Sequence, residues 1–214
     1  MKAYFISGLG ADKTIFRNIR IPASIEPVYL EWIEAKNNES LASYASRLSA
    51  GIDSSEPFIL VGLSFGGMIA VEISKIYKPY KLILISSIPG IQDLPKLYKW
   101  AGKLHLQKIV PVSLLKQGSL LKRLFSTETR EDKIFLRKMI SKVDPRFVKW
   151  ALDAILHWDN KTLPENCIHI HGKMDGILPV SNTRPTHIIP RGGHLMVMNR
   201  AKEINKILEE NLCF

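Results

Sequence analysis

The chain has 214 residues, of which 46% are hydrophobic, and it carries a formal net charge of +10 at pH 7. This length predicts one folded domain with a sizeable core, and the two cysteines, Cys167 and Cys213, are too few for a disulfide framework. A secretion signal and a membrane span are also not expected, because glycines soon interrupt the first apolar run and no later stretch reaches about 18 apolar residues. We therefore expect a soluble, cytoplasmic protein with reduced thiols and no transmembrane segment.

Along the chain, short runs rich in β-branched or aromatic residues alternate with segments of helical period, which is the pattern of βα units and a parallel sheet. Strands are predicted at residues 2–6, 27–30, 58–62, 81–86, 167–171 and 186–189. The third and fourth contain uninterrupted apolar runs, as in strands with helices on both faces, and they should lie centrally. The predicted fold class is α/β, with a doubly wound, mostly parallel sheet of about six strands.

Helices are predicted where apolar residues recur at positions i, i+3, i+4 and i+7. One such stripe comprises Leu41, Tyr44, Ala45 and Leu48, and another comprises Ile204, Ile207, Leu208 and Leu212.

Between the fourth and fifth predicted strands, the alternation stops and the chain becomes helical and rich in lysine. Thr129 marks one helix start, and the pair Asp144-Pro145 marks another by combining an N-cap residue with proline at the first helical position. The second of these helices carries Phe147, Ala151, Ala154 and Trp158 at helical spacing. We expect residues 1–90 and 161–214 to form the α/β core and residues 91–160 to form a helical insertion.

The predicted strand 58–62 leads directly into Gly62-Leu63-Ser64-Phe65-Gly66, and an apolar segment typical of a helix follows. This order of strand, turn and helix is the context in which a G-x-S-x-G pattern marks a nucleophilic serine. A serine at such a turn has an unfavourable backbone conformation, and small residues two positions away let strand and helix approach each other. The alternative is that the pattern occurs by chance. The predicted strand before it and the predicted helix after it argue against chance.

Three blocks of the sequence resemble the α/β-hydrolase family. They are residues 7–12 after the first strand, the serine turn, and residues 171–179 (His-Gly-Lys-Met-Asp-Gly-Ile-Leu-Pro) followed by Gly-Gly-His at 192–194. These blocks cover both halves of the predicted core, whereas the insertion matches none of them. The resemblance implies an α/β-hydrolase core with a helical lid, in which serine, acid and histidine follow in that order along the chain.

Carried onto this chain, the resemblance makes Ser64 the nucleophile, Asp175 the acid and His194 the base. His194 follows a predicted strand and two glycines, which places it on a loop at the same sheet edge as the serine. Histidines 169 and 187 lie within predicted strands, and histidines 105 and 157 lie in the insertion. One alternative is that Asp175 is only a turn aspartate, since Asp175-Gly176 is also a common turn dipeptide. Asp93 is the main rival for the role of the acid, because some members of the family carry it one strand earlier.

An enzyme of this kind stabilises the developing oxyanion with two N–H donors. The resemblance implies the backbone amides of Phe65 and Leu9, although Ser7 stands where the commoner family pattern has a histidine. A flexible turn is the alternative for residues 8–10. A dinucleotide-binding loop is excluded, because Lys13 occupies the position of the third glycine in G-x-G-x-x-G.

Residues 91–155 contain 14 Lys and Arg against 6 Asp and Glu, so most of the net charge belongs to the predicted lid. We expect the lid to cover the serine, with Trp100, Phe125 and Trp150 either lining the pocket or packing within the lid itself. Its lysines either form a solvated outer face or attract an acidic partner or an anionic membrane surface. Nucleic acid binding is not expected, because no interleaved aromatic platform is present.

The predicted function is hydrolysis of a small carboxylic ester or thioester through an acyl-enzyme intermediate, with a small-molecule acyl substrate and neither a metal nor an organic cofactor. Two alternatives stay open. One is cleavage of an amide or carbon–carbon bond by the same three residues, and the other is a binding protein of the same fold without turnover. The sequence makes no prediction of the oligomeric state.

Overall fold

The computed structural model describes residues 1–103, 129–141, 143–162 and 164–212. Six strands form one sheet in the order β2-β1-β3-β4-β5-β6, and each neighbouring pair is parallel. Their bounds are β1 Lys2–Ile6, β2 Glu26–Leu30, β3 Phe58–Leu63, β4 Lys81–Ile85, β5 Cys167–Gly172 and β6 His187–Ile189. The predicted strands are confirmed with ends shifted by about one residue, and β3 and β4 are central as expected.

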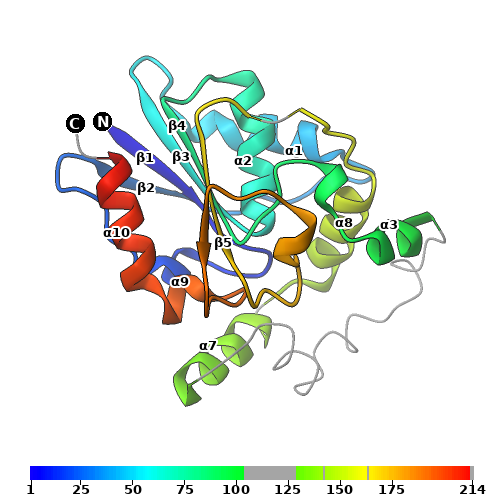
Figure 1. Cartoon of the computed structure of the whole chain (residues 1–214). Helices are drawn as coiled ribbons and strands as arrows, with labels where there is room; N and C mark the ends of the chain where they lie inside the picture. Colours follow the sequence, from blue (N-terminus) through cyan, green and yellow to red (C-terminus); the bar gives the residue numbers. More distant parts are fainter. Residues whose placement is uncertain (104–128, 142, 163, 213–214) are drawn as a thin grey trace.

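Helices cover both faces of this sheet (Figure 1). The α-helices are α1 Leu41–Leu48, α2 Phe65–Ile76, α3 Lys96–Lys103, α7 Arg130–Ser141, α8 Pro145–Leu156, α9 Met196–Asn199 and α10 Ala201–Leu212. Short 3-10 helices occupy Lys13–Phe16, Ser49–Gly51, Ile91–Asp93 and Val180–Asn182. The order of strands and helices confirms the α/β class and the doubly wound architecture.

Two hydrophobic clusters lie on opposite faces of the sheet, and the alternation of side chains along each strand decides which residue joins which cluster. Tyr4 and Leu60 face α1, α2 and α8, whereas Phe5 and Val61 face α9 and α10. The strands at the centre therefore need apolar residues at consecutive positions, which is the pattern that identified them in the sequence.

The segment predicted as an insertion supplies α3, α7 and α8. Thr129 caps α7, where its hydroxyl accepts from the amide of Asp132 and the Asp132 carboxylate accepts from the amide of Thr129. Asp144 caps α8 by accepting from the amide of Arg146 at 2.8 Å. Ala151 of α8 lies in the same buried cluster as α1 and α2, so this helix packs on the core.

Trp158 corrects one expectation, because α8 ends at Leu156, before the last residue of the predicted apolar stripe. The chain leaves the helix there, and the indole N–H of Trp158 donates to the buried carboxylate of Glu72 on α2 at 2.6 Å. The side chain still reaches the buried cluster that the stripe predicted. His105 and Phe125 lie outside the described residues.

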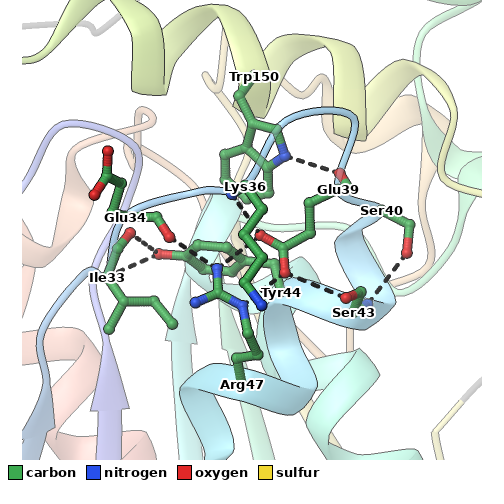
Figure 2. Close-up of polar contacts among 9 residues, drawn as sticks. All are labelled: Ile33, Glu34, Lys36, Glu39, Ser40, Ser43, Tyr44, Arg47 and Trp150. Carbon is green, nitrogen blue, oxygen red and sulfur yellow. Dashed lines mark hydrogen bonds and ion pairs between the residues drawn. The ribbon is translucent and has the colours of Figure 1, made fainter.

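The side chain of Glu39 connects the loop before α1 to Arg47 of that helix (Figure 2). Its carboxylate accepts two hydrogen bonds of 2.7 Å from the guanidinium of Arg47 and one of 2.9 Å from the amide of Lys36. The hydrogen bonds from Arg47 lower the pKa of Glu39 to about 2, although burial of the carboxylate opposes them. Trp150 of α8 donates its indole N–H to the backbone carbonyl of Glu39 at 2.8 Å, so the same residue also anchors α8.

The hydroxyl of Tyr44 fixes the other end of this loop, since it donates to the carbonyl of Ile33 at 2.9 Å and accepts from the amide of Ile33 at 3.0 Å. Burial raises the pKa of Tyr44 to about 12. Its ring packs against Trp150 with the centroids 4.4 Å apart.

Within the described ranges, no helix has the length and apolar character needed to span a bilayer.

Candidate active site

Ser64 lies at the turn between β3 and α2 and has φ 52° and ψ −119°. This conformation is rare for a residue with a side chain, and it is kept because the neighbouring structure fixes both peptide groups. The amide of Ser64 donates to the carbonyl of Ile85 in β4 at 2.9 Å. Its carbonyl accepts from the amide of Gly67 at 2.9 Å and from the hydroxyl of Ser87 at 2.7 Å.

Close packing around the turn explains the glycine at position 66. A Cβ atom on Gly66 would lie 2.2 Å from the carbonyl oxygen of Ser7 and 2.4 Å from that of Ile6. The start of α2 therefore rests directly on the backbone at the end of β1. The serine hydroxyl projects at the carboxyl edge of the sheet, where parallel α/β folds place their ligands.

His194 connects Ser64 to Asp175. Its Nε2 lies 2.9 Å from the Oγ of Ser64, and its Nδ1 lies 2.8 Å from the Oδ2 of Asp175. The carboxylate can only accept, so Nδ1 carries the proton and Nε2 is left to accept the proton of the serine hydroxyl. The structure thus brings together the three residues that the sequence singled out.

Asp175 is buried and fully engaged. Its Oδ1 accepts from the amides of Ile177 and Leu178, each at 2.9 Å, and its Oδ2 faces His194. Burial raises the pKa of a carboxyl group, but the electrostatic interaction with His194 and the hydrogen bonds from His171, His194 and Leu178 outweigh it and hold the pKa of Asp175 well below its usual range. The acid therefore remains ionised.

The loops that carry the acid and the histidine are packed backbone to backbone. A Cβ atom on Gly172 would lie 2.2 Å from the carbonyl oxygen of Gly192. The amide of Met174 donates to that same carbonyl at 2.8 Å. This contact sets the distance between Asp175 and His194 and explains why both blocks contain glycine.

Asp93, the alternative acid, lies in the 3-10 helix after β4 and is not the carboxylate bonded to His194. Partial burial raises its pKa, with the charges of Lys99 and Arg184 opposing the rise. Among the remaining described histidines, 157 follows α8, 187 lies in β6, and 169 and 171 lie inside β5.

Phe65 and Leu9, whose amides were predicted to bind the oxyanion, flank the serine. Phe65 is the first residue of α2, so its N–H belongs to the helix N-terminus beside Ser64. Leu9 lies in the turn closed by the hydrogen bond of 2.9 Å from the amide of Ala11 to the carbonyl of Gly8, and a Cβ atom on Gly8 would be 3.5 Å from the Cβ of Ser64.

Side chains hold this turn in place. The hydroxyl of Ser7 donates to the carbonyl of Ala11 at 2.7 Å, and the indole N–H of Trp32 donates to the same oxygen at 3.0 Å. Trp32 also stacks on Phe65 with the ring centroids 5.5 Å apart. Ser7, which departs from the commoner family pattern, therefore has a local structural role.

Sequence reasoning missed the polar groups behind the acid, namely His169, His171 and Ser87. The two histidines occupy alternate positions of β5 and so face the same side of the sheet. That alternation was the available signal, but it does not distinguish buried from exposed rings. Among the described residues, no group of three or more histidine, cysteine or carboxylate side chains is arranged to hold a metal ion.

No protein-family model and no curated protein sequence matches this chain. Solved structures do match. A thermophilic esterase from Thermogutta terrifontis is 17% identical with a TM-score of 0.75, covering 100% of this chain and 91% of that one. An esterase from Exiguobacterium antarcticum is 16% identical with a TM-score of 0.72, covering 97% and 90%, and a bromoperoxidase from Bacillus anthracis is 15% identical with a TM-score of 0.66, covering 97% and 90%. These likenesses confirm the predicted fold: the chain has the α/β-hydrolase fold.

Proposed function

We propose that this protein is a serine hydrolase that cleaves a small carboxylic ester or thioester through an acyl-enzyme intermediate. The observation that carries the proposal is the continuous hydrogen-bonded chain from the hydroxyl of Ser64 through His194 to the buried carboxylate of Asp175, at 2.9 and 2.8 Å. The esterases among the structures of similar fold support the same reaction class.

In the acylation step, the Oγ of Ser64 attacks the substrate carbonyl carbon and its proton passes to the Nε2 of His194. The amides of Phe65 and Leu9 donate to the oxyanion that forms. Collapse of the tetrahedral intermediate expels the alcohol or thiol, which takes the proton from His194. Water then attacks the acyl-enzyme with His194 as base, and the carboxylic acid leaves while Ser64 regains its proton.

Asp175 remains a carboxylate throughout this cycle, because its donors hold its pKa low. It fixes the Nδ1–H tautomer of His194 and stabilises the imidazolium that forms transiently. The alternatives with this arrangement are hydrolysis of an amide or carbon–carbon bond, and binding without turnover. The intact hydrogen-bonded chain favours turnover over binding alone.

Labelling with a fluorophosphonate probe tests the nucleophile. We expect the wild type to be labelled, Ser64→Ala to lose all labelling and His194→Ala to lose most of it, because the hydroxyl needs its base. Ser74→Ala is a matched control on α2, whose hydroxyl bonds only within that helix at 2.7 Å to Val71, and it should label normally. Labelling of Ser64→Ala at the wild-type level would exclude Ser64.

A panel of chromogenic esters, acyl thioesters and anilides tests the reaction class and, with two substitutions, the acid. Asp175→Asn should lower kcat about 10³ to 10⁴-fold, because an amide cannot orient and stabilise the imidazolium as a carboxylate does. Asp93→Asn should change kcat little. The reverse pattern would show that Asp93 is the acid, and exclusive cleavage of anilides would favour an amidase.

A further inference from the structure

Two buried histidines of β5 lie behind the acid and take no part in the mechanism proposed above. His171 and His169 are 0% and 4% exposed. The Nε2 of His171 lies 2.7 Å from the carbonyl oxygen of Leu178 and 3.4 Å from the Oδ2 of Asp175. The Nε2 of His169 lies 3.0 Å from the carbonyl oxygen of Ser87 and 3.1 Å from the Nδ1 of His171.

These contacts determine the tautomers of both rings. A carbonyl oxygen only accepts, so the Nε2 of His171 donates to Leu178 and the Nε2 of His169 donates to Ser87. If the Nδ1 of His171 also carried a proton, the Nε2 of His169 would have to accept a hydrogen bond from it. That nitrogen would then have no hydrogen to donate to the carbonyl oxygen of Ser87, and two lone pairs would face each other. The ring of His171 is therefore neutral with its proton on Nε2, and His169 also carries a proton on Nε2. Burial, together with the neighbouring His171, lowers the pKa of His169 to about 4, which agrees with a neutral ring.

Leu178 links this chain to the acid. Its amide donates to the Oδ1 of Asp175 at 2.9 Å, while its carbonyl accepts from His171 at 2.7 Å. His171 thus fixes the loop that carries the donors of the carboxylate. Its Nε2 also lies 3.4 Å from the Oδ2 of Asp175. With the amide of Ile177 and with His194, four donors surround a carboxylate that offers about four acceptor positions.

Ser87 links the other end of the chain to the nucleophile. Its carbonyl accepts from His169, and its hydroxyl donates to the carbonyl of Ser64 at 2.7 Å. One series of hydrogen bonds therefore runs from the backbone of Ser64 through the interior of the sheet to the side chain of Asp175. Rotation of the carboxylate would break its own hydrogen bonds from Ile177, Leu178 and His194 at once.

We propose that His171, oriented by His169, is a positioning residue that holds Asp175 and the loop at residues 175–178 in the orientation required by His194. The inference rests on the proposed function and assigns a role to two side chains that do not touch the substrate. The described titratable groups facing the carboxylate are His171, His194 and Tyr98 of α3, and burial and the charge of Asp175 raise the pKa of Tyr98.

A matched pair of variants separates positioning from simple support of the core. His171→Leu removes the donor, whereas the amide nitrogen of His171→Gln can occupy the place of Nε2 and donate in its stead. We expect His171→Leu to lower kcat about 10 to 100-fold, as for loss of a hydrogen bond to a charged group, with KM within about twofold of the wild type. His171→Gln should recover most of the loss.

The pH–rate profile gives a second readout. A carboxylate that is no longer held toward His194 stabilises its imidazolium less, so the acid limb of kcat/KM should move to lower pH in His171→Leu and return in His171→Gln. His157→Gln, an exposed histidine at the end of α8, should leave both kcat and the acid limb unchanged. A folded His171→Leu with wild-type kcat and acid limb would overturn the proposal, as would equal losses in both His171 variants without any shift of the limb.

Nitrogen-15 NMR tests the same idea without turnover. In the wild type, His169 and His171 should both be Nε2–H tautomers, and an Nδ1–H tautomer or a charged ring would overturn the proposal even if His171→Leu did not fold. The low-field Nδ1–H resonance of His194 should shift or broaden in His171→Leu and persist in His171→Gln. If the wild type hydrolysed none of the substrates while these signals behaved as expected, the proposed function would fail and the positioning role would stand.

Discussion

Replacing Glu39 by glutamine removes one charge from the contact with Arg47 and keeps the shape of the side chain. A pKa lowered from the ordinary value of 4.5 to about 2 corresponds to at most about 3.5 kcal/mol of folding free energy, at about 1.4 kcal/mol per pKa unit. The Glu39 side chain is 3% exposed, but that of Arg47 is 31% exposed and water weakens the pair. We therefore expect Glu39→Gln to lower the free energy of unfolding by about 2 kcal/mol at pH 7.

The pH dependence of this loss identifies its cause. Because the folded protein depresses the pKa of Glu39, the stabilisation is complete above about pH 4.5 and disappears as the pH falls through about 2. Urea unfolding of the wild type and of Glu39→Gln between pH 7 and pH 2.5 should show a constant difference in stability down to about pH 5 and a shrinking one below.

Glu210→Gln on α10 provides the control, because Glu210 and Lys206 lie 3.8 Å apart and are both more than half exposed. That substitution should change stability little at any pH. If the difference between the wild type and Glu39→Gln stayed the same down to pH 2.5, the charge of the buried carboxylate would not be its source. The loop before α1 would then be held by its neutral hydrogen bonds alone.

Three further predictions follow from packing. Gly66→Ala should strongly lower the melting temperature, because its methyl group would lie 2.2 Å from the backbone oxygen of Ser7, just after β1. Gly51→Ala is the control: its methyl group would lie 3.2 Å from the side chain of Leu30, and its effect should be small. Trp158→Phe should lower the urea-derived stability by about 1 to 3 kcal/mol, since the buried carboxylate of Glu72 loses its indole donor and retains the ammonium group of Lys75. An unchanged stability would contradict that role. Burial raises the pKa of Cys167 to about 12. In a Cys213→Ser background, iodoacetamide at pH 8 should therefore modify the native protein far more slowly than the denatured one. Equal rates would contradict burial of the thiol.

The sequence predicted those parts of the fold that depend on local pattern. Uninterrupted apolar runs identified β3 and β4, because two helical layers require apolar residues on both faces of a central strand. The turn at Ser64 was recognisable because the sharp approach of strand and helix requires glycine at position 66. The residues that meet in the site, Asp175 and His194, were found through their resemblance to known blocks and their place after parallel strands.

Interactions that cross between elements were not predictable in this way. The ion pair of Glu39 with Arg47 joins a loop to a helix without any regular spacing, and the bond of Trp158 to Glu72 spans 86 positions of the chain. The role of His171 was hidden for a similar reason, since its partner Leu178 lies in a loop whose path depends on the packing of Gly172 against Gly192. Tertiary contacts of this kind leave no periodic signal in one sequence.

The order of the site residues along the chain has a consequence for biosynthesis. Ser64 and the strands around it lie in the first 90 residues, whereas Asp175 and His194 lie among the last 40. A nascent chain can therefore form the serine turn long before the proposed base and acid leave the ribosome. Under the proposed function, Ser64 stays inactive while β5 and β6 are missing from the edge of the sheet. The reactivity proposed for Ser64 would thus mark the completion of folding, since it requires β5 to pair with β4 and β6 to pair with β5.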